Sequence, residues 1–189
     1  MSRTSRTLLP LVALAALFVT LAPATAHADR TRPVYVGFGG GPYVLFDCCS
    51  VHGRLSGQFG WHFGGTDIGF VMAVEAATTL GPDYLMFMGG LRIGGDIEVT
   101  GDQDFAVLLR PNGLFAGGFI DGNGAGFQPQ GYFLFQPAFD IRLAFADRAV
   151  VFWMRPAAFD VIVSWDRPAR GDWHVEGAYQ AMAGFDFQF

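Results

Sequence analysis

The sequence contains no lysine, and all twelve of its strongly basic residues are arginine. Charged residues make up only 15% of the chain, whereas soluble domains usually carry about 25%. The seventeen acidic residues outnumber the basic ones, which argues against a nucleic-acid-binding protein because such proteins present a basic surface. Disorder is also excluded, since disordered chains combine low hydrophobicity with high charge, and 51% of these residues are hydrophobic.

Long hydrophobic runs are equally scarce, and the only one is Leu8–Ala22, close to the N-terminus. Arginines precede this run, and the small-residue pattern Ala26-His27-Ala28 follows it. A membrane-spanning helix needs roughly 20 apolar residues, so the run is short for one. A basic start, a short apolar stretch and a small-residue cleavage site predict a secretory signal peptide. We therefore expect residues 1–28 to be removed and residues 29–189 to form the mature domain.

Phenylalanine and glycine, by contrast, are abundant, with 20 and 26 residues. Apolar residues alternate with small or polar ones in successive segments, and a period of two is typical of β-strands. In one such segment Phe87 and Leu91 lie on one face and Arg92 lies on the other. The sequence predicts eight strands, within residues 34–46, 55–63, 68–75, 85–99, 105–119, 133–145, 149–165 and 173–189.

The seventh of these segments contains a conflict of phase. Arg155 and Asp160 have opposite parity, yet both side chains should avoid the apolar face. One extra residue in a strand reverses its phase, and proline is tolerated at such a bulge. The sequence therefore predicts a β-bulge near Pro156.

The connections between the segments alternate in character. Short polar connections at 64–66, 100–104 and 146–148 alternate with mostly longer ones, rich in Gly, Pro and Asp, at 47–53, 77–83, 121–129 and 166–171. Short turns at one end and longer loops at the other are typical of outer-membrane β-barrels. We expect an all-β, eight-stranded, antiparallel up-and-down transmembrane barrel, with a ten-stranded barrel as the structural alternative.

The two faces of the predicted strands differ in a way that indicates the solvent. The face without phenylalanine carries Gly, Ala, Ser, Gln and a few charged residues. These side chains are too small and the charges too few for a surface in contact with water, but they suit a narrow interior. The aromatic face is then expected to contact lipid, where a closed barrel satisfies every backbone hydrogen bond. A soluble periplasmic β-protein with its aromatic face as a core is the alternative.

The chain ends Gly184-Phe185-Asp186-Phe187-Gln188-Phe189. A terminal aromatic residue with aromatics two and four positions earlier resembles the C-terminal signal of bacterial outer-membrane β-barrels, and Gly184 lies where that pattern often has glycine. The size is similar to the small barrels of the OmpA, OmpX and OmpW type. This resemblance implies insertion by the barrel-assembly machinery and a location in the outer membrane of a Gram-negative bacterium.

Several charged residues fall on the face that we expect to line the interior: Arg92, Arg110, Asp140, Arg142, Arg155 and Asp160. An eight-stranded barrel is just wide enough for its side chains to fill it. The planar guanidinium group of arginine pairs bidentately with carboxylates. We therefore expect these residues to form an ion-pair network that plugs the lumen.

Candidate chemistry elsewhere is sparse. Cys48 and Cys49 are adjacent in the first long loop, and we predict loop thiols without a catalytic duty. Trp165 and Trp173 flank the fourth long loop, where an interfacial aromatic girdle is expected. No metal site, cofactor or catalytic residue is predicted.

The leading functional hypothesis is a non-enzymatic barrel that supports the envelope or presents its loops to partners. It contacts outer-membrane lipid, binds no nucleic acid and is expected to be a monomer. A narrow pore or conduit for small or hydrophobic solutes is the second hypothesis. The third is a lipid A-modifying enzyme that uses Ser164, His174 and Glu176 near the rim, since a Ser-His-acid set can activate a nucleophile.

Overall fold

The fold comes from a computed structural model, which describes residues 32–46, 51–64, 68–82, 84–101, 104–122, 130–165 and 173–189. The expected signal peptide, residues 1–28, and the expected loop thiols Cys48 and Cys49 lie outside the described residues. Within the described part of the chain, no helix has the length and apolar character needed to span a membrane.

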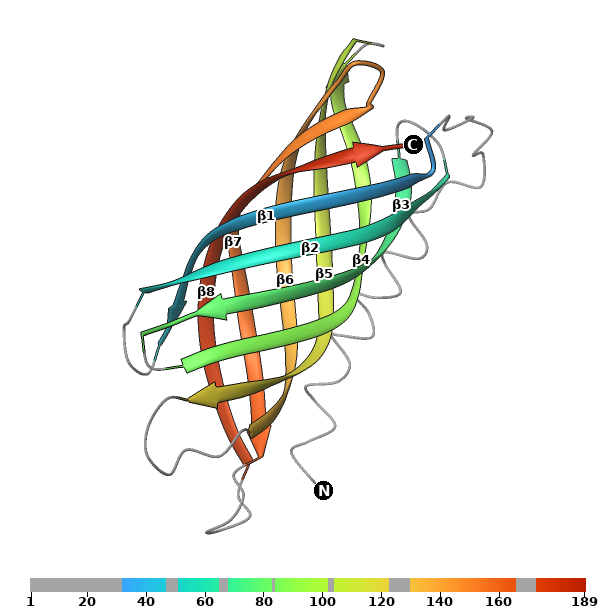
Figure 1. Ribbon diagram of the computed structural model, residues 1–189. Coiled ribbons are helices and arrows are strands. Elements are labelled where there is room, and N and C mark those ends of the chain that lie inside the picture. The colour runs from blue at the N-terminus through green and yellow to red at the C-terminus, as the bar shows by residue number, and fades with distance from the viewer. Residues whose placement is uncertain are drawn as a thin grey trace, which may run out of the picture.

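Eight antiparallel strands close into a single barrel in which each strand pairs with its neighbours in sequence, and β8 pairs with β1 (Figure 1). The eight strands are β1 (Val34–Leu45), β2 (Val51–Gly64), β3 (Ile68–Leu80), β4 (Tyr84–Gly101), β5 (Phe105–Gly122), β6 (Gln130–Phe145), β7 (Val150–Trp165) and β8 (Trp173–Gln188). The predicted strand number and topology are confirmed, and the ten-stranded alternative is wrong. A closed sheet leaves no unpaired edge, which is the property a spanning β-structure requires.

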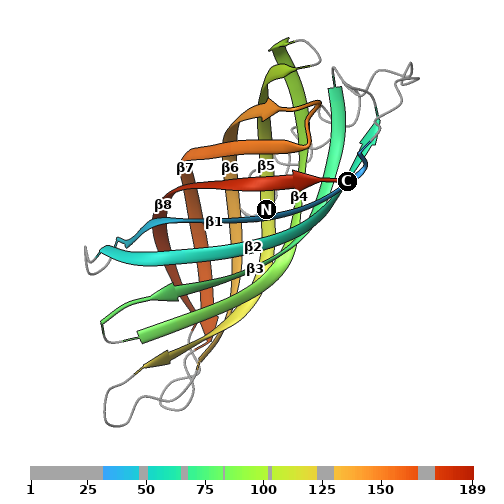
Figure 2. The same cartoon turned by 45° about the horizontal axis from the view of Figure 1, so that its top comes forward.

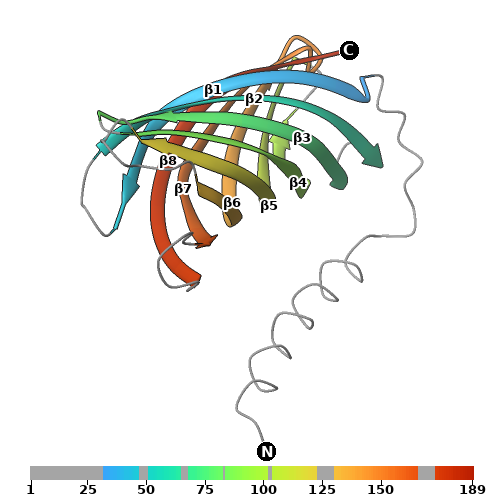
Figure 3. The same ribbon diagram turned by 60° about the horizontal axis from the view of Figure 1, so that its bottom comes forward.

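The two ends of the barrel differ in the segments that they carry. The end of the chain lies beside the start of β1 (Figure 2), where the Phe189 amide donates to the Val34 carbonyl at 2.8 Å. We call this end, which also carries the β2–β3, β4–β5 and β6–β7 turns, the terminal end. The opposite end carries the other four connections, and we call it the loop end (Figure 3).

The outer wall is covered with phenylalanine. Sixteen phenylalanine side chains are exposed, and Phe133 is the most exposed of those on the strands at 67%. Neighbouring rings contact one another across strands, for example Phe115 with Phe135 at 4.9 Å between ring centroids. The apolar face therefore points outward, as the alternation predicts, and the small and polar face lines the interior.

The predicted bulge near Pro156 is confirmed. From Arg155 to Ala158, β7 has one more residue than the segment of β8 that it pairs with, which runs from Met182 to Gln180. This extra residue turns the Asp160 side chain to the same side of the sheet as the Arg155 side chain, and both are buried in the interior. The phase conflict in the sequence is thus resolved by backbone geometry.

The strands are longer than the sequence predicts. Residues 77–80, which we assigned to a loop, continue β3, because Ala77 and Thr79 are small enough to face the crowded interior opposite Met88 and Met86. The β3–β4 connection is consequently as short as the turns at the terminal end. Strand β2 likewise begins inside the predicted first loop, at Val51.

Candidate functional site

Among the residues that the structure describes, ten charged side chains are buried in the interior of the barrel, and these form the candidate site. Five are arginines and five are carboxylates, so their formal charges cancel. They are Arg54, Glu75, Arg92, Asp96, Arg110, Asp140, Arg142, Arg155, Asp160 and Asp186. They come from seven of the eight strands, because alternate residues of every strand project inward. β1 contributes Tyr35 and Tyr43 to the buried interior instead.

Asp96 is the centre of the network nearest the terminal end. Both oxygens of its carboxylate accept from Arg110, from Nε at 2.6 Å and from Nη2 at 2.8 Å. His62 Nδ1 lies 3.3 Å from the same carboxylate, and Arg110 also donates to the Tyr35 hydroxyl at 3.3 Å. A bidentate pair of this kind fixes the guanidinium plane as well as neutralising the charge.

The Asp186 carboxylate, beside the Asp96 cluster, accepts hydrogen bonds from three side chains. Gln58 Nε2 donates to its Oδ1 at 2.7 Å and Trp153 Nε1 donates at 3.0 Å. Arg142 Nη2 donates to the other oxygen and forms an ion pair. Arg142 Nε also lies 4.0 Å from the Asp96 carboxylate. Arg142 therefore joins Asp96 to Asp186, and the two carboxylates belong to one continuous network.

The Trp153 ring fits into this network because its neighbours on β1 and β8 are glycines. A Cβ atom added to Gly39 would meet the ring carbons of Trp153 inside any allowed contact distance, and one added to Gly184 would meet the ring and the backbone of β1. The C-terminal pattern that contains Gly184 therefore also has a packing role in the interior.

A second network lies closer to the loop end and is built around Gln136. Its amide nitrogen donates to Asp160 at 2.6 Å, and its amide oxygen accepts from Arg92 at 2.7 Å. Asp160 in turn pairs with Arg54 at 2.9 Å, and Arg92 pairs with Glu75 at 2.5 Å. One neutral amide on β6 thus couples two ion pairs whose members come from four other strands.

The fifth ion pair joins β6 to β7. Arg155 donates to both oxygens of Asp140, from Nε at 2.7 Å and from Nη2 at 3.1 Å. Its guanidinium carbon lies 5.3 Å from the centre of the Trp153 ring, which is within cation–π range. All ten buried charges therefore have an oppositely charged partner within the barrel.

All six residues that are predicted to form the network are buried in this interior: Arg92, Arg110, Asp140, Arg142, Arg155 and Asp160. Among these six, only Asp140 and Arg155 pair with each other. The other four pair with charged residues that are not among those predicted: Arg54, Glu75, Asp96 and Asp186. Each of these four residues occupies one of the alternate strand positions that carry small or polar side chains and face the interior. The alternation in the sequence is therefore sufficient to identify them as interior residues.

A cluster of apolar side chains fills the interior at the loop end. It includes Tyr43, Met86, Met88, Leu134 and Ile162, all of them buried. These residues lie at the ends of their strands that face the loop end. The charged networks and this apolar cluster therefore follow one another along the barrel axis.

The remaining predicted sites are placed as follows. Phe185, Phe187 and Phe189 project outward from the end of the chain, and Phe185 and Phe187 pack against Phe38 of β1 with ring centroids 6.5 and 6.1 Å apart. Ser164 pairs in register with His174 across β7 and β8; Ser164 is buried and His174 is exposed. The side chains of Trp165 and Trp173, the expected girdle, lie outside the described part of the structure.

Comparison with known proteins finds relatives by structure only. No family model matches the sequence, and no curated protein matches it. Neisserial surface protein A (NspA) is similar in structure with a TM-score of 0.52 and 10% identity, over 82% of this chain and 97% of that one. Ail, the attachment invasion locus protein of Yersinia pestis, aligns with a TM-score of 0.46 and 10% identity, over 83% and 97%. The chain has the fold of the small eight-stranded bacterial outer-membrane β-barrels.

Proposed function

We propose that the protein is an integral outer-membrane β-barrel with a lumen sealed by ion pairs, and that it acts in envelope structure or surface interaction and not as a channel or an enzyme. One observation supports the sealed lumen most directly. Ten buried charges of equal and opposite number pair with each other inside the barrel. A conducting lumen would expose such groups to water, whereas these side chains have almost no accessible surface.

The outer wall supports the membrane location. A wall of exposed phenylalanine is incompatible with water over so large an area, because soluble monomers rarely expose contiguous apolar patches above a few hundred Å². The similar solved barrel from Neisseria is named a surface protein. A surface role places the function on the loop end, since outer-membrane barrels direct their longer loops outward and their short turns to the periplasm.

The location is tested by fractionation and heat-modifiability. The protein is expected in the outer-membrane fraction, and unboiled protein should migrate differently from boiled protein on an SDS gel because the closed barrel resists unfolding. Recovery from the soluble periplasm with no mobility shift on boiling would contradict the location.

The sealed lumen is tested by electrical recording. The full chain, processed and refolded into a planar lipid bilayer, is expected to give no conductance steps. An established porin inserted into the same bilayer provides the positive control. Steady conductance steps from the purified protein would contradict a sealed lumen and favour the narrow-pore hypothesis.

A further inference from the structure

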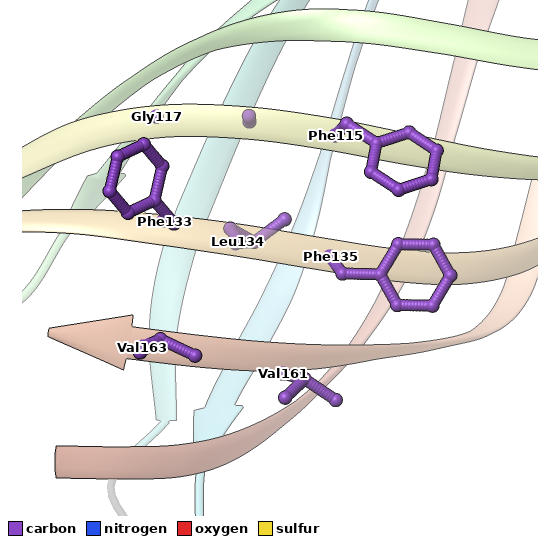
Figure 4. Close-up of a pocket in the computed structure, with 8 residues that line it drawn as sticks. Phe115, Gly117, Phe133, Leu134, Phe135, Val161 and Val163 are labelled. Carbon is purple, nitrogen blue, oxygen red and sulfur yellow. The ribbon is translucent and has the colours of Figure 1, made fainter. Parts of the chain in front are cut away.

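An apolar groove runs over the outer wall where β5, β6 and β7 lie side by side (Figure 4). It has a volume of about 430 Å³ and is lined by Phe115, Gly117, Phe133, Phe135, Val161 and Val163, with Ala116 and Leu134 beneath. Figure 4 shows the Phe115 and Phe135 rings together at one side, Phe133 near Gly117 at the other, and the two valines on the next strand.

The groove exists because short side chains lie between large ones. Gly117 has no side chain, and a Cβ atom placed there would have only ordinary contacts, the nearest at 3.8 Å. On the same strand Phe119 packs against Phe87 of β4, with ring centroids 5.1 Å apart. Val161 and Val163 of β7 are smaller than the rings of Phe133 and Phe135 on β6. The hollow is therefore encoded in the sequence of three adjacent strands.

The position of the groove along the strands determines its depth in the bilayer. Its residues lie toward the end of β5 and β7 and near the start of β6, which is the loop half of the barrel. In a barrel inserted as the proposed function requires, this half lies in the leaflet that faces away from the periplasm. The surroundings of the groove are then hydrocarbon.

We propose that this groove is a binding site for one acyl chain of a lipid in the extracellular leaflet, an inference that rests on the proposed membrane location. Every lining side chain is apolar, so the site matches a hydrocarbon and offers nothing to a headgroup. The hollow is open on its outer side and has a volume of about 430 Å³, which is enough for a segment of one hydrocarbon chain and too little for a whole lipid.

A protein occupant fits the groove less well. An α-helix with its side chains is about 10–12 Å across, whereas the outer two of three strands spaced about 4.8 Å apart lie only about 9.6 Å from each other. A second copy of the chain would need roughly 20–30 residues on each side for a stable interface. The groove has eight lining residues, so the lipid chain is the occupant that the geometry supports.

The test uses the processed protein in lipid vesicles that contain a phosphatidylethanolamine with a photoreactive diazirine near the middle of one acyl chain. After irradiation, peptides are identified by mass spectrometry. Labelling is expected to concentrate on the β5–β7 peptides, and Gly117→Leu should reduce it there about fivefold or more by filling the groove. Gly57→Leu is the matched control, because a Cβ atom at Gly57 would likewise have only ordinary contacts, but this residue lies on β2, outside the groove.

Even labelling around the barrel, or labelling of β5–β7 that Gly117→Leu does not change, would overturn the acyl-chain site. Covalent dimers formed by photo-cross-linking from a benzoylphenylalanine placed at position 133 or 135 would also overturn it, in favour of a second copy. Each variant is first checked for the mobility shift on boiling. Loss of that shift in the unsubstituted protein would instead contradict the membrane barrel itself, so the two failures are distinguishable.

Discussion

At the scale of single residues, the interior is organised by carboxylates that each hold more than one donor. Asp186 accepts from Gln58, Arg142 and Trp153, and Asp96 binds Arg110 with His62 and Arg142 nearby. A buried ion pair contributes little net stability when compared with an apolar pair of equal volume, but removing one partner leaves an uncompensated buried charge. Single substitutions in this network should therefore be much more harmful than the average strength of the pairs suggests.

Asp186→Ala is expected to lower the free energy of unfolding by about 3–5 kcal/mol, because it leaves Arg142 buried without its partner. Urea unfolding of the refolded protein in micelles measures the change. Glu98→Ala is the control, since Glu98 and its partner Arg148 retain 16% and 17% exposure, and partly solvated pairs contribute about 1 kcal/mol or less. Equal losses in the two variants would contradict the argument.

The contact between Gly39 and Trp153 gives a second residue-scale prediction. Gly39→Ala should destabilise the barrel by about 1–3 kcal/mol, because the new methyl group overlaps the indole ring. Gly57→Ala should have a small effect, since its Cβ meets nothing closer than 3.9 Å. The cost of Gly39→Ala is expected to shrink in a Trp153→Leu background. An undiminished cost would show that the backbone of β8 is the obstacle and not the ring.

The candidate site could be predicted in part at this scale. Parity alone identifies which residues face the interior, and it was sufficient for Arg92, Arg110 and Arg142. It does not identify partners, because those depend on the stagger between strands that are distant in sequence: Arg142 pairs with Asp186, and Arg54 pairs with Asp160. The stagger is fixed when the barrel closes, and no local pattern in the sequence encodes it.

At the scale of strands, the β6–β7 pair differs from the β3–β4 pair in regularity. Pairing stops after Phe135–Val161 and resumes at Ala138–Ala158, and the bulge at Pro156 follows. Pro137 also lies in this interval and has no amide hydrogen to donate. By comparison, β3 and β4 pair without interruption from Ile68–Ile97 to Leu80–Leu85. The ladder between β6 and β7 is thus less regular than the ladder between β3 and β4.

Amide hydrogen exchange should reflect this difference. Amides of β6 and β7 close to the interruption are expected to exchange at least about tenfold faster than mid-strand amides of β3, such as that of Val74. The reason is that local opening requires breaking fewer hydrogen bonds there. Mass spectrometry or NMR of the protein in micelles gives both rates. Equal exchange rates in the two strand pairs would contradict this prediction. They would indicate that the side-chain hydrogen bond from Gln136 to Asp160 holds β6 and β7 together across the interruption.

The strands also show what sequence patterns can and cannot locate. The bulge near Pro156 was predictable because two charged residues demanded the same face. The continuation of β3 through Ala77 and Thr79 was not, because small residues on both faces give no contrast between apolar and polar positions. Strand ends in this barrel are set by pairing with a neighbour, and Met86 and Met88 supply that pairing from the next strand.

At the scale of the whole molecule, charge is divided between two regions. The buried interior contains five arginines and five carboxylates and is formally neutral, while the whole chain has an excess of acidic residues. The excess therefore lies outside the buried interior. Salt largely screens the interaction between exposed charges that are more than a Debye length apart, which is about 10 Å at 0.1 M, but it screens buried pairs far less.

The thermal stability of the barrel should consequently be almost independent of salt. The temperature at which the unboiled gel band converts to the boiled form is expected to change by only a few degrees between about 0.05 M and 1 M NaCl, because the ion pairs that hold the interior are not accessible to the added ions. Gel mobility after incubation over a temperature series measures this directly. Asp186→Ala, which removes a buried partner and not a surface one, should lower the conversion temperature equally at both salt concentrations. A large fall in stability at high salt in the unsubstituted protein would mean that solvated surface pairs carry the fold, and the sealed interior would then have to be abandoned.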